Sequence, residues 1–138
     1  MTVRRATEAD IPRLLGYAQR FLDYHPITSQ VPRDLAAVEA VLRKLLTADD
    51  GVLLVTDHGV VGGMINPMWC APDVRVALEL FWWADKGGLS LMRAFHKWAT
   101  ENGANIIQVA MIVGRKDVST IYDRMGFMPV ELSFVRAA

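Results

Sequence analysis

The sequence predicts a mixed α/β fold built on a mostly antiparallel central sheet, and three features support this prediction. Two apolar runs, Val52–Thr56 and Val60–Trp69, flank the turn-like triplet Asp57–Gly59 and are typical of a β-hairpin. A third apolar run, Val76–Trp83, leads through the glycine pair Gly87–Gly88 into an amphipathic helix. Helical and strand patterns alternate elsewhere, so we expect helices on both faces of the sheet.

The other elements follow from periodicity and from residues that start or stop helices. Apolar residues recur at helical spacing over Ile11–Leu22 and Leu35–Leu45, each run preceded by residues that commonly cap a helix. The remaining expected elements are a strand at Thr2–Ala6, a helix at Leu89–Glu101, a strand at Asn105–Val113, a helix at Asp117–Met125 ended by Gly126, and a strand at Met128–Val135. Without a linker or an internal repeat, we expect one domain over residues 1–138.

Composition narrows the class of protein and its partners. The 138 residues have no formal net charge and no basic block, which argues against nucleic-acid binding. No apolar run approaches the roughly 20 residues of a membrane span, and the first residues lack the apolar segment of a secretion signal. The one cysteine, Cys70, cannot form an internal disulfide, and three scattered histidines do not make a metal site. We therefore expect a cytoplasmic protein without a bound metal.

The glycine junction after the long apolar strand allows two interpretations. Glycines ahead of a helix often serve only turn geometry or packing. The same arrangement places unpaired backbone N–H groups and a partial positive charge at one spot, which suits a phosphate. Lys86 would add a cation there, and Asp85 would partly offset it.

One carboxylate, Glu79, interrupts the apolar strand. Strict alternation would place Glu79, Phe81 and Trp83 on one face of the sheet. A carboxylate between aromatic side chains is partly desolvated, which raises its pKa and makes it a better proton acceptor near neutral pH. The alternative is a solvent-facing side chain on a half-exposed sheet, the more common place for a charged residue.

Further along the chain, Tyr122 and the basic pair Arg115–Lys116 are the other candidates. Tyr122 is either an aromatic residue of the core or a proton donor, since a phenol can protonate a departing thiolate. The basic pair could face a polyphosphate or could simply be solvated loop charges. His25, in the loop after the first helix, is a weaker candidate for contact with a substrate.

Five segments together resemble the GNAT superfamily of acyl-CoA N-acyltransferases. The segment Ile121–Phe127 resembles that family's C-terminal Phe-Tyr-x-x-x-Gly-Phe element. The other segments are Val3–Ile11, similar to the first strand and helix, Val60–Ile65 and Glu79–Trp83, similar to the third and fourth strands, and Leu91–Ala99, similar to the helix after the pyrophosphate loop. They occur in the family's order over nearly the whole length.

The resemblance implies a single GNAT-like domain in which strands 4 and 5 splay apart and acetyl-CoA lies in the gap, with no metal. It implies that Tyr122 supplies the acid for the leaving thiolate and that Glu79 is a candidate general base. The implied cofactor-binding residues are Phe81, Trp82, Trp83, Lys86, Gly87, Gly88, Leu89, Ser90 and Arg115.

The phosphate loop departs from the family pattern. The family loop typically reads Arg-Gly-x-Gly-x-Gly/Ala, whereas this chain is about four residues shorter there and keeps only Lys86–Gly88. Two hypotheses follow. The first is an N-acetyltransferase that moves an acetyl group from acetyl-CoA to a primary amine by direct attack. The alternative is a catalytically silent binding or assembly module of the same fold, which the short loop and aromatic residues such as Trp69 motivate.

The acceptor amine, a small molecule or a peptide, is not encoded in a recognisable motif. The family places it against the regions Tyr24–Pro32 and Trp69–Asp73. We expect neither a membrane nor a nucleic acid as partner. The apolar segment Val130–Val135 could pair two subunits in a homodimer.

Overall fold

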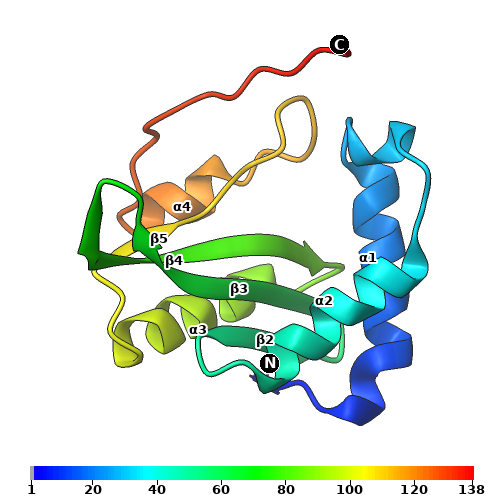
Figure 1. Cartoon of the computed structure of the whole chain (residues 1–138), viewed down its shortest axis with the longest axis horizontal. Coiled ribbons are helices and arrows are strands. Elements are labelled where there is room, and N and C mark those ends of the chain that lie inside the picture. Colours follow the sequence, from blue (N-terminus) through cyan, green and yellow to red (C-terminus); the bar gives the residue numbers. More distant parts are fainter. Residues whose placement is uncertain (1) are drawn as a thin grey trace.

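The computed structural model describes residues 2–138 and has a five-stranded sheet in the order β1-β2-β3-β4-β5 (Figure 1). The first four strands are antiparallel, and β5 runs parallel to β4. The strands are β1 Arg4–Arg5, β2 Gly51–Thr56, β3 Gly59–Met68, β4 Ala71–Ala84 and β5 Ile106–Gln108. The predicted hairpin and the mixed, mostly antiparallel sheet are thus confirmed.

Helices cover both faces of this sheet, as predicted. One face carries α1 and α2, and the opposite face carries α3, with α4 beside β5 (Figure 1). The helices are α1 Ile11–Tyr24, α2 Leu35–Thr47, α3 Gly88–Glu101 and α4 Ser119–Arg124, with short 3-10 turns at Glu8–Asp10 and Thr28–Gln30. None of the helices in the described part of the chain has the length and apolar character needed to cross a membrane.

The core lies on both sides of β2 and β3. Successive residues of β2 alternate, so Val52 and Leu54 pack with α3 while Leu53 and Val55 pack with α1 and α2. All six residues of β2 are buried, which explains why this strand reads as a continuous apolar run.

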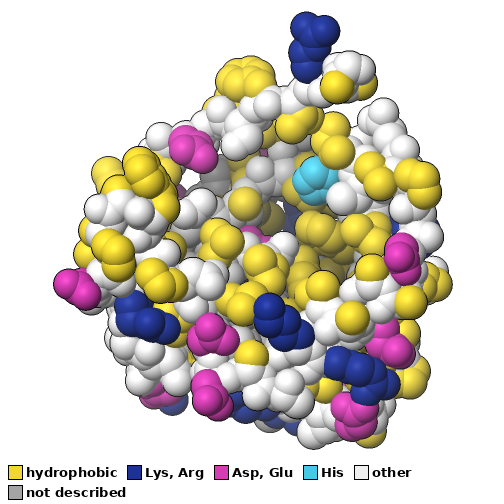
Figure 2. Space-filling view, in the orientation of Figure 1, with side chains coloured by type: hydrophobic (Ala, Val, Ile, Leu, Met, Phe, Trp, Pro, Cys, Tyr) yellow, Lys and Arg dark blue, Asp and Glu magenta, His cyan; other side chains and the backbone are white. Residues whose placement is uncertain are grey.

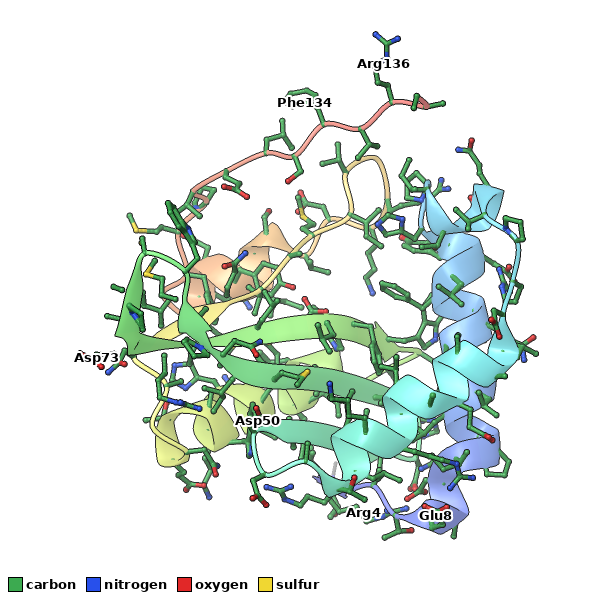
Figure 3. All side chains as sticks on the ribbon, viewed as in Figure 1. Arg4, Glu8, Asp50, Asp73, Phe134 and Arg136 are labelled. Atoms are coloured by element: carbon green, nitrogen blue, oxygen red, sulfur yellow. The ribbon has the colours of Figure 1, made fainter. Side chains whose placement is uncertain are left out.

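An ion-paired carboxylate fixes the start of α1. Asp10 is buried and accepts hydrogen bonds from Arg4 at 2.8 and 2.9 Å, from the Thr7 N–H at 2.8 Å and from Arg13 at 3.0 Å. Figure 3 shows Arg4 and Glu8 at this same end of the molecule. The Arg4 hydrogen bonds hold the pKa of Asp10 well below its usual range. The cluster therefore ties β1 to the first helical turn.

The predicted C-terminal strands differ from the structure. The strand expected at Asn105–Val113 is confined to Ile106–Gln108, and the strand expected at Met128–Val135 does not form. Residues 128–138 run as an exposed tail away from the sheet, and Phe134 and Arg136 lie out on it (Figure 3). The apolar alternation of the tail is real, but a strand also needs a neighbour for its backbone hydrogen bonds.

Candidate functional site

The site begins where β4 and β5 separate. Their parallel pairing ends at Leu78 and Gln108, while β4 continues through Glu79–Ala84 along β3 (Figure 1). Beyond Gln108 the chain turns away from β4. The expected splay between the fourth and fifth strands is therefore present, and we call the gap that it opens the fork.

A β-bulge at Leu80 sets the direction of every side chain around the fork. Gly62 pairs with Phe81 and Gly63 pairs with Glu79, so Leu80 is an extra residue on β4. Phe81 consequently packs with α1 and α2. Glu79 follows its partner Gly63 to the other face, because a Cβ built on Gly63 would lie 2.4 Å from Phe95 of α3.

The predicted alternation of β4 is therefore wrong across the bulge. Phe81 and Trp83 share the α1 and α2 face, but Glu79 shares the opposite face with Trp82. The physical reason is the additional residue, which reverses the inward and outward order of the strand. Glu79 is thus placed next to α4 rather than between Phe81 and Trp83.

Glu79 and Tyr122 both form a hydrogen bond with the backbone of Ala110. The Ala110 N–H donates to Oε2 of Glu79 at 3.2 Å, and the Tyr122 hydroxyl donates to the Ala110 carbonyl at 2.7 Å. Burial raises the pKa of Glu79 to about 7, against the opposing effect of the Ala110 hydrogen bond. Burial and the negative charge of Glu79 both raise the pKa of Tyr122. Near neutral pH the site therefore combines a half-ionised carboxylate with a protonated phenol.

Tyr122 is held in place by the end of α4 and by two aromatic rings. The ring centroids of Trp82 and Phe127 lie 6.0 and 5.7 Å from that of Tyr122. Gly126 closes α4 with a φ of 82°, which lets the Phe127 N–H reach the Tyr122 carbonyl at 3.0 Å. The predicted glycine stop is confirmed, and it brings Phe127 back onto Tyr122.

The start of α3 offers backbone donors without a side-chain cap. Gly87 takes a φ of 72° and Gly88 begins the helix, one residue ahead of the predicted start. The Ser90 N–H bonds to the Gly87 carbonyl at 3.1 Å, which leaves Gly88 and Leu89 with N–H groups that have no acceptor within the helix. This end of α3 therefore retains the geometry that favours an anion.

Asp85 forms an ion pair with Arg20 of α1. Arg20 of α1 binds the Asp85 carboxylate through two hydrogen bonds of 2.7 and 2.9 Å, and the Trp83 indole N–H adds a third at 3.3 Å. The guanidinium carbon of Arg20 also lies over the indole of Trp83, 4.9 Å from the ring centroid. These contacts tie the loop before α3 to α1.

Trp82 lies between the start of α3 and Tyr122. A Cβ built on Gly88 would lie 2.7 Å from Cζ2 of Trp82 and 3.3 Å from Cε2, the carbon bonded to the indole Nε1. That Nε1 is buried and has no hydrogen-bond partner within residues 2–138. A buried N–H donor without an acceptor is unusual, and here it lies beside the open backbone donors of α3.

Arg115 contacts the end of α1. Its Nε donates to the Tyr24 carbonyl at 2.9 Å, and its guanidinium carbon lies 5.3 Å from the Tyr24 ring centroid. The Lys116 N–H donates to the Tyr24 hydroxyl at 2.7 Å. Both residues join the segment after β5 to the end of α1. The His25 side chain contacts its own loop, since its Nδ1 accepts a hydrogen bond from the Ile27 N–H at 3.1 Å.

Sequence reasoning missed Tyr24 and Leu80 as positions that shape the site. Tyr24 binds Arg115 and Lys116 in the segment that follows Ala110, and Leu80 forms the bulge. The consecutive glycines Gly62 and Gly63 opposite Leu80 were the available signal, because close packing and bulges often require glycine in a strand.

Figure 2 shows a hollow, with hydrophobic side chains around it, on the face that carries α1 and α2.

No protein-family model and no curated protein sequence matches this chain. Solved structures do match over nearly the whole length. A transcriptional regulator from Bacillus halodurans is 18% identical, with a TM-score of 0.75 over 99% of each chain. The aminoglycoside N-acetyltransferase AAC(6')-Iy in complex with CoA is 15% identical, with a TM-score of 0.73 over 99% of this chain and 93% of that one. The ribosomal-protein-alanine N-acetyltransferase from Brucella melitensis is 13% identical, with a TM-score of 0.68 over 100% of both chains.

At these identities the likeness establishes the fold. The chain has the fold of the GNAT acyl-CoA N-acyltransferases, with the splayed fourth and fifth strands. The resemblance drawn from the sequence segments is therefore confirmed at the level of architecture.

Proposed function

We propose that the protein is an acetyl-CoA-dependent N-acetyltransferase that acts on a primary amine. One observation carries this proposal: a carboxylate with a pKa raised to about 7 and a phenol are held on the same residue, Ala110, at the fork. A proton acceptor and a proton donor in such proximity suit a reaction that removes a proton from one atom and supplies one to another.

The residues around the start of α3 fit the pyrophosphate of acetyl-CoA. The N–H groups of Gly88 and Leu89 would bind it, with Lys86 as the nearby cation. Bound there, acetyl-CoA would supply a thioester, an acyl carbon open to attack by an amine.

The side chains at the fork would then handle the protons. Glu79, directly or through a water, takes a proton from the ammonium group of the acceptor. The neutral nitrogen forms a bond to the acyl carbon and gives up a second proton to water, the carbon–sulfur bond breaks, and the sulfur leaves as a thiolate. Glu79 returns the first proton to solvent. Tyr122 protonates the thiolate and regains its proton from solvent. A main-chain N–H of the bulged segment around Leu80 and Phe81 would polarise the carbonyl.

Two measurements test this proposal. A ligand present at 100 times its dissociation constant stabilises the fold by about 2.7 kcal/mol, so acetyl-CoA should raise the melting temperature measurably. A thiol-release assay with a panel of primary amines should then detect turnover that falls by about 100-fold or more in Glu79→Gln. An unchanged melting temperature at millimolar acetyl-CoA would contradict the proposal, and it would favour a silent module of the same fold.

A further inference from the structure

The face of β4 opposite Glu79 carries an apolar groove that the proposed chemistry does not use. The groove has a volume of about 210 Å³ and lies between α1, α2 and the bulged part of β4. Every residue that lines it is apolar, and the principal ones are Phe21, Leu22, Val38, Val41, Leu80 and Phe81. In Figure 2 this side of the molecule shows hydrophobic side chains gathered around the hollow.

The bulge places this groove next to the fork. Leu80, the extra residue of β4, lines the groove, whereas the preceding residue, Glu79, points to the other face. Leu80 is 39% exposed, and Val41, across from it on α2, is 47% exposed. A molecule that fills the groove therefore lies on the opposite face of β4 from the Glu79 carboxylate, and its amine reaches the fork around the edge of β4 that β5 leaves unpaired beyond Leu78.

The lining decides what the groove can bind. A cavity of about 150 Å³ lined by leucine, isoleucine and phenylalanine accepts a benzene molecule, so a groove of about 210 Å³ has room for one aromatic ring or a branched alkyl chain. No carboxylate lines it, and a second cationic group there would lose its hydration without a partner. A smaller groove of about 180 Å³ shares Leu22 and Val38 and leads to Arg33 and Asp34 at the start of α2.

We propose that this groove binds the apolar part of the acceptor, and that the acceptor is therefore a small primary amine carrying an aryl or branched alkyl group. This inference rests on the proposed function, since it names the substrate class of that reaction. Removing one ring from water corresponds to a preference of about 10- to 100-fold over an amine without the ring. Polyamines and aminoglycosides, which carry several cations, gain nothing from the groove.

The primary experiment compares 2-phenylethylamine, ethylamine and spermidine in the thiol-release assay at saturating acetyl-CoA. We expect kcat/KM for 2-phenylethylamine to exceed that for ethylamine and spermidine by about 10-fold or more. Val41→Asn, which places an amide in the groove, should reduce this ratio by roughly fivefold or more. Ala40→Asn is the matched control, because Ala40 is exposed on the same helix and outside the groove. It should leave the ratio unchanged, and neither variant should alter stabilisation by acetyl-CoA.

Amide chemical shifts provide a readout that does not depend on turnover. Titration of the 15N-labelled protein with 2-phenylethylamine should shift the amides of Val41, Leu80 and Phe21, and Val41→Asn should weaken the response. Equal turnover of the three amines, or a ratio unaffected by Val41→Asn, would overturn the substrate class while leaving the acetyltransferase proposal intact. Unshifted amides would overturn groove binding. If acetyl-CoA fails to bind while the amides shift, the proposed function and the acceptor assignment fail together, and an apolar amine site remains.

Discussion

Replacing Glu79 by glutamine should stabilise the protein at high pH while it removes the proposed base. Burial raises the pKa of this carboxyl from 4.5 to about 7 in the folded chain. A glutamine side chain would keep the shape of the glutamate and an oxygen that accepts the Ala110 N–H. The variant therefore separates the cost of the buried charge from the packing of the site.

The magnitude follows from the two pKa values. Below about pH 4.5 the carboxyl is protonated in the folded and unfolded chains, so the wild type and Glu79→Gln should have similar stability. Between about 4.5 and 7 only the unfolded chain ionises, and the wild type loses about 1.36 kcal/mol for each pH unit. Above about pH 7 both states are ionised, and the accumulated loss is about 3 kcal/mol.

Thermal unfolding of both proteins at pH 4 and pH 8.5 tests this directly. At pH 8.5 we expect Glu79→Gln to melt about 10 °C higher than the wild type, and at pH 4 the two should nearly coincide. All other titrating groups are shared, so their contributions cancel in the difference. A difference independent of pH, or a wild type that is the more stable at pH 8.5, would refute a carboxyl with a raised pKa at this position.

Three further perturbations test other parts of the structure. Tyr122→Phe should lower kcat by about 100-fold with little change in acetyl-CoA affinity, and the lost 2.7 Å bond to Ala110 should cost only about 1 kcal/mol by thermal denaturation. Asp10→Asn should lower the unfolding free energy by about 1–3 kcal/mol at pH 7, and because the pKa of Asp10 is lowered in the fold, the loss should shrink below about pH 4. Truncation after Phe127 should move the melting temperature by less than about 2 °C, because residues 128–138 are exposed. A larger drop would show that the tail packs against the domain.

Periodicity and end signals predicted the hairpin, the helices and the glycine junction because these features are local. The stop at Gly126 and the start of α3 depend on residues a few positions apart, so sequence spacing captured both. Glu79 was identifiable because a single carboxylate interrupts an apolar strand. The pairing of that carboxylate with Tyr122 needed the fold, since the two residues lie on different elements and Ala110 is 31 residues from Glu79 in the chain.

Features that depend on distant pairing were beyond sequence reasoning. The face on which Glu79 lies depends on how β4 aligns with Gly62 and Gly63, and no pattern within β4 itself reveals the extra residue. The placement of Arg115 depends on its contact with Tyr24, on a helix at the other end of the chain. The tail has the alternation of a strand, but alternation reports only a preference for a half-buried surface.

The extra residue in β4 also constrains how the protein can be redesigned. Before Leu80 the odd-numbered residues of β4, such as Ala77, point toward α3. After Leu80 the even-numbered residues, such as Trp82, do so. Deletion of that single residue would remove the bulge and leave Phe81 opposite Gly62, whereas one uninterrupted alternation applied across residues 79–83 would assign Phe81 and Trp82 to the wrong layers. A combinatorial library of β4 therefore needs one pattern of inward and outward positions before position 80 and the opposite pattern after it.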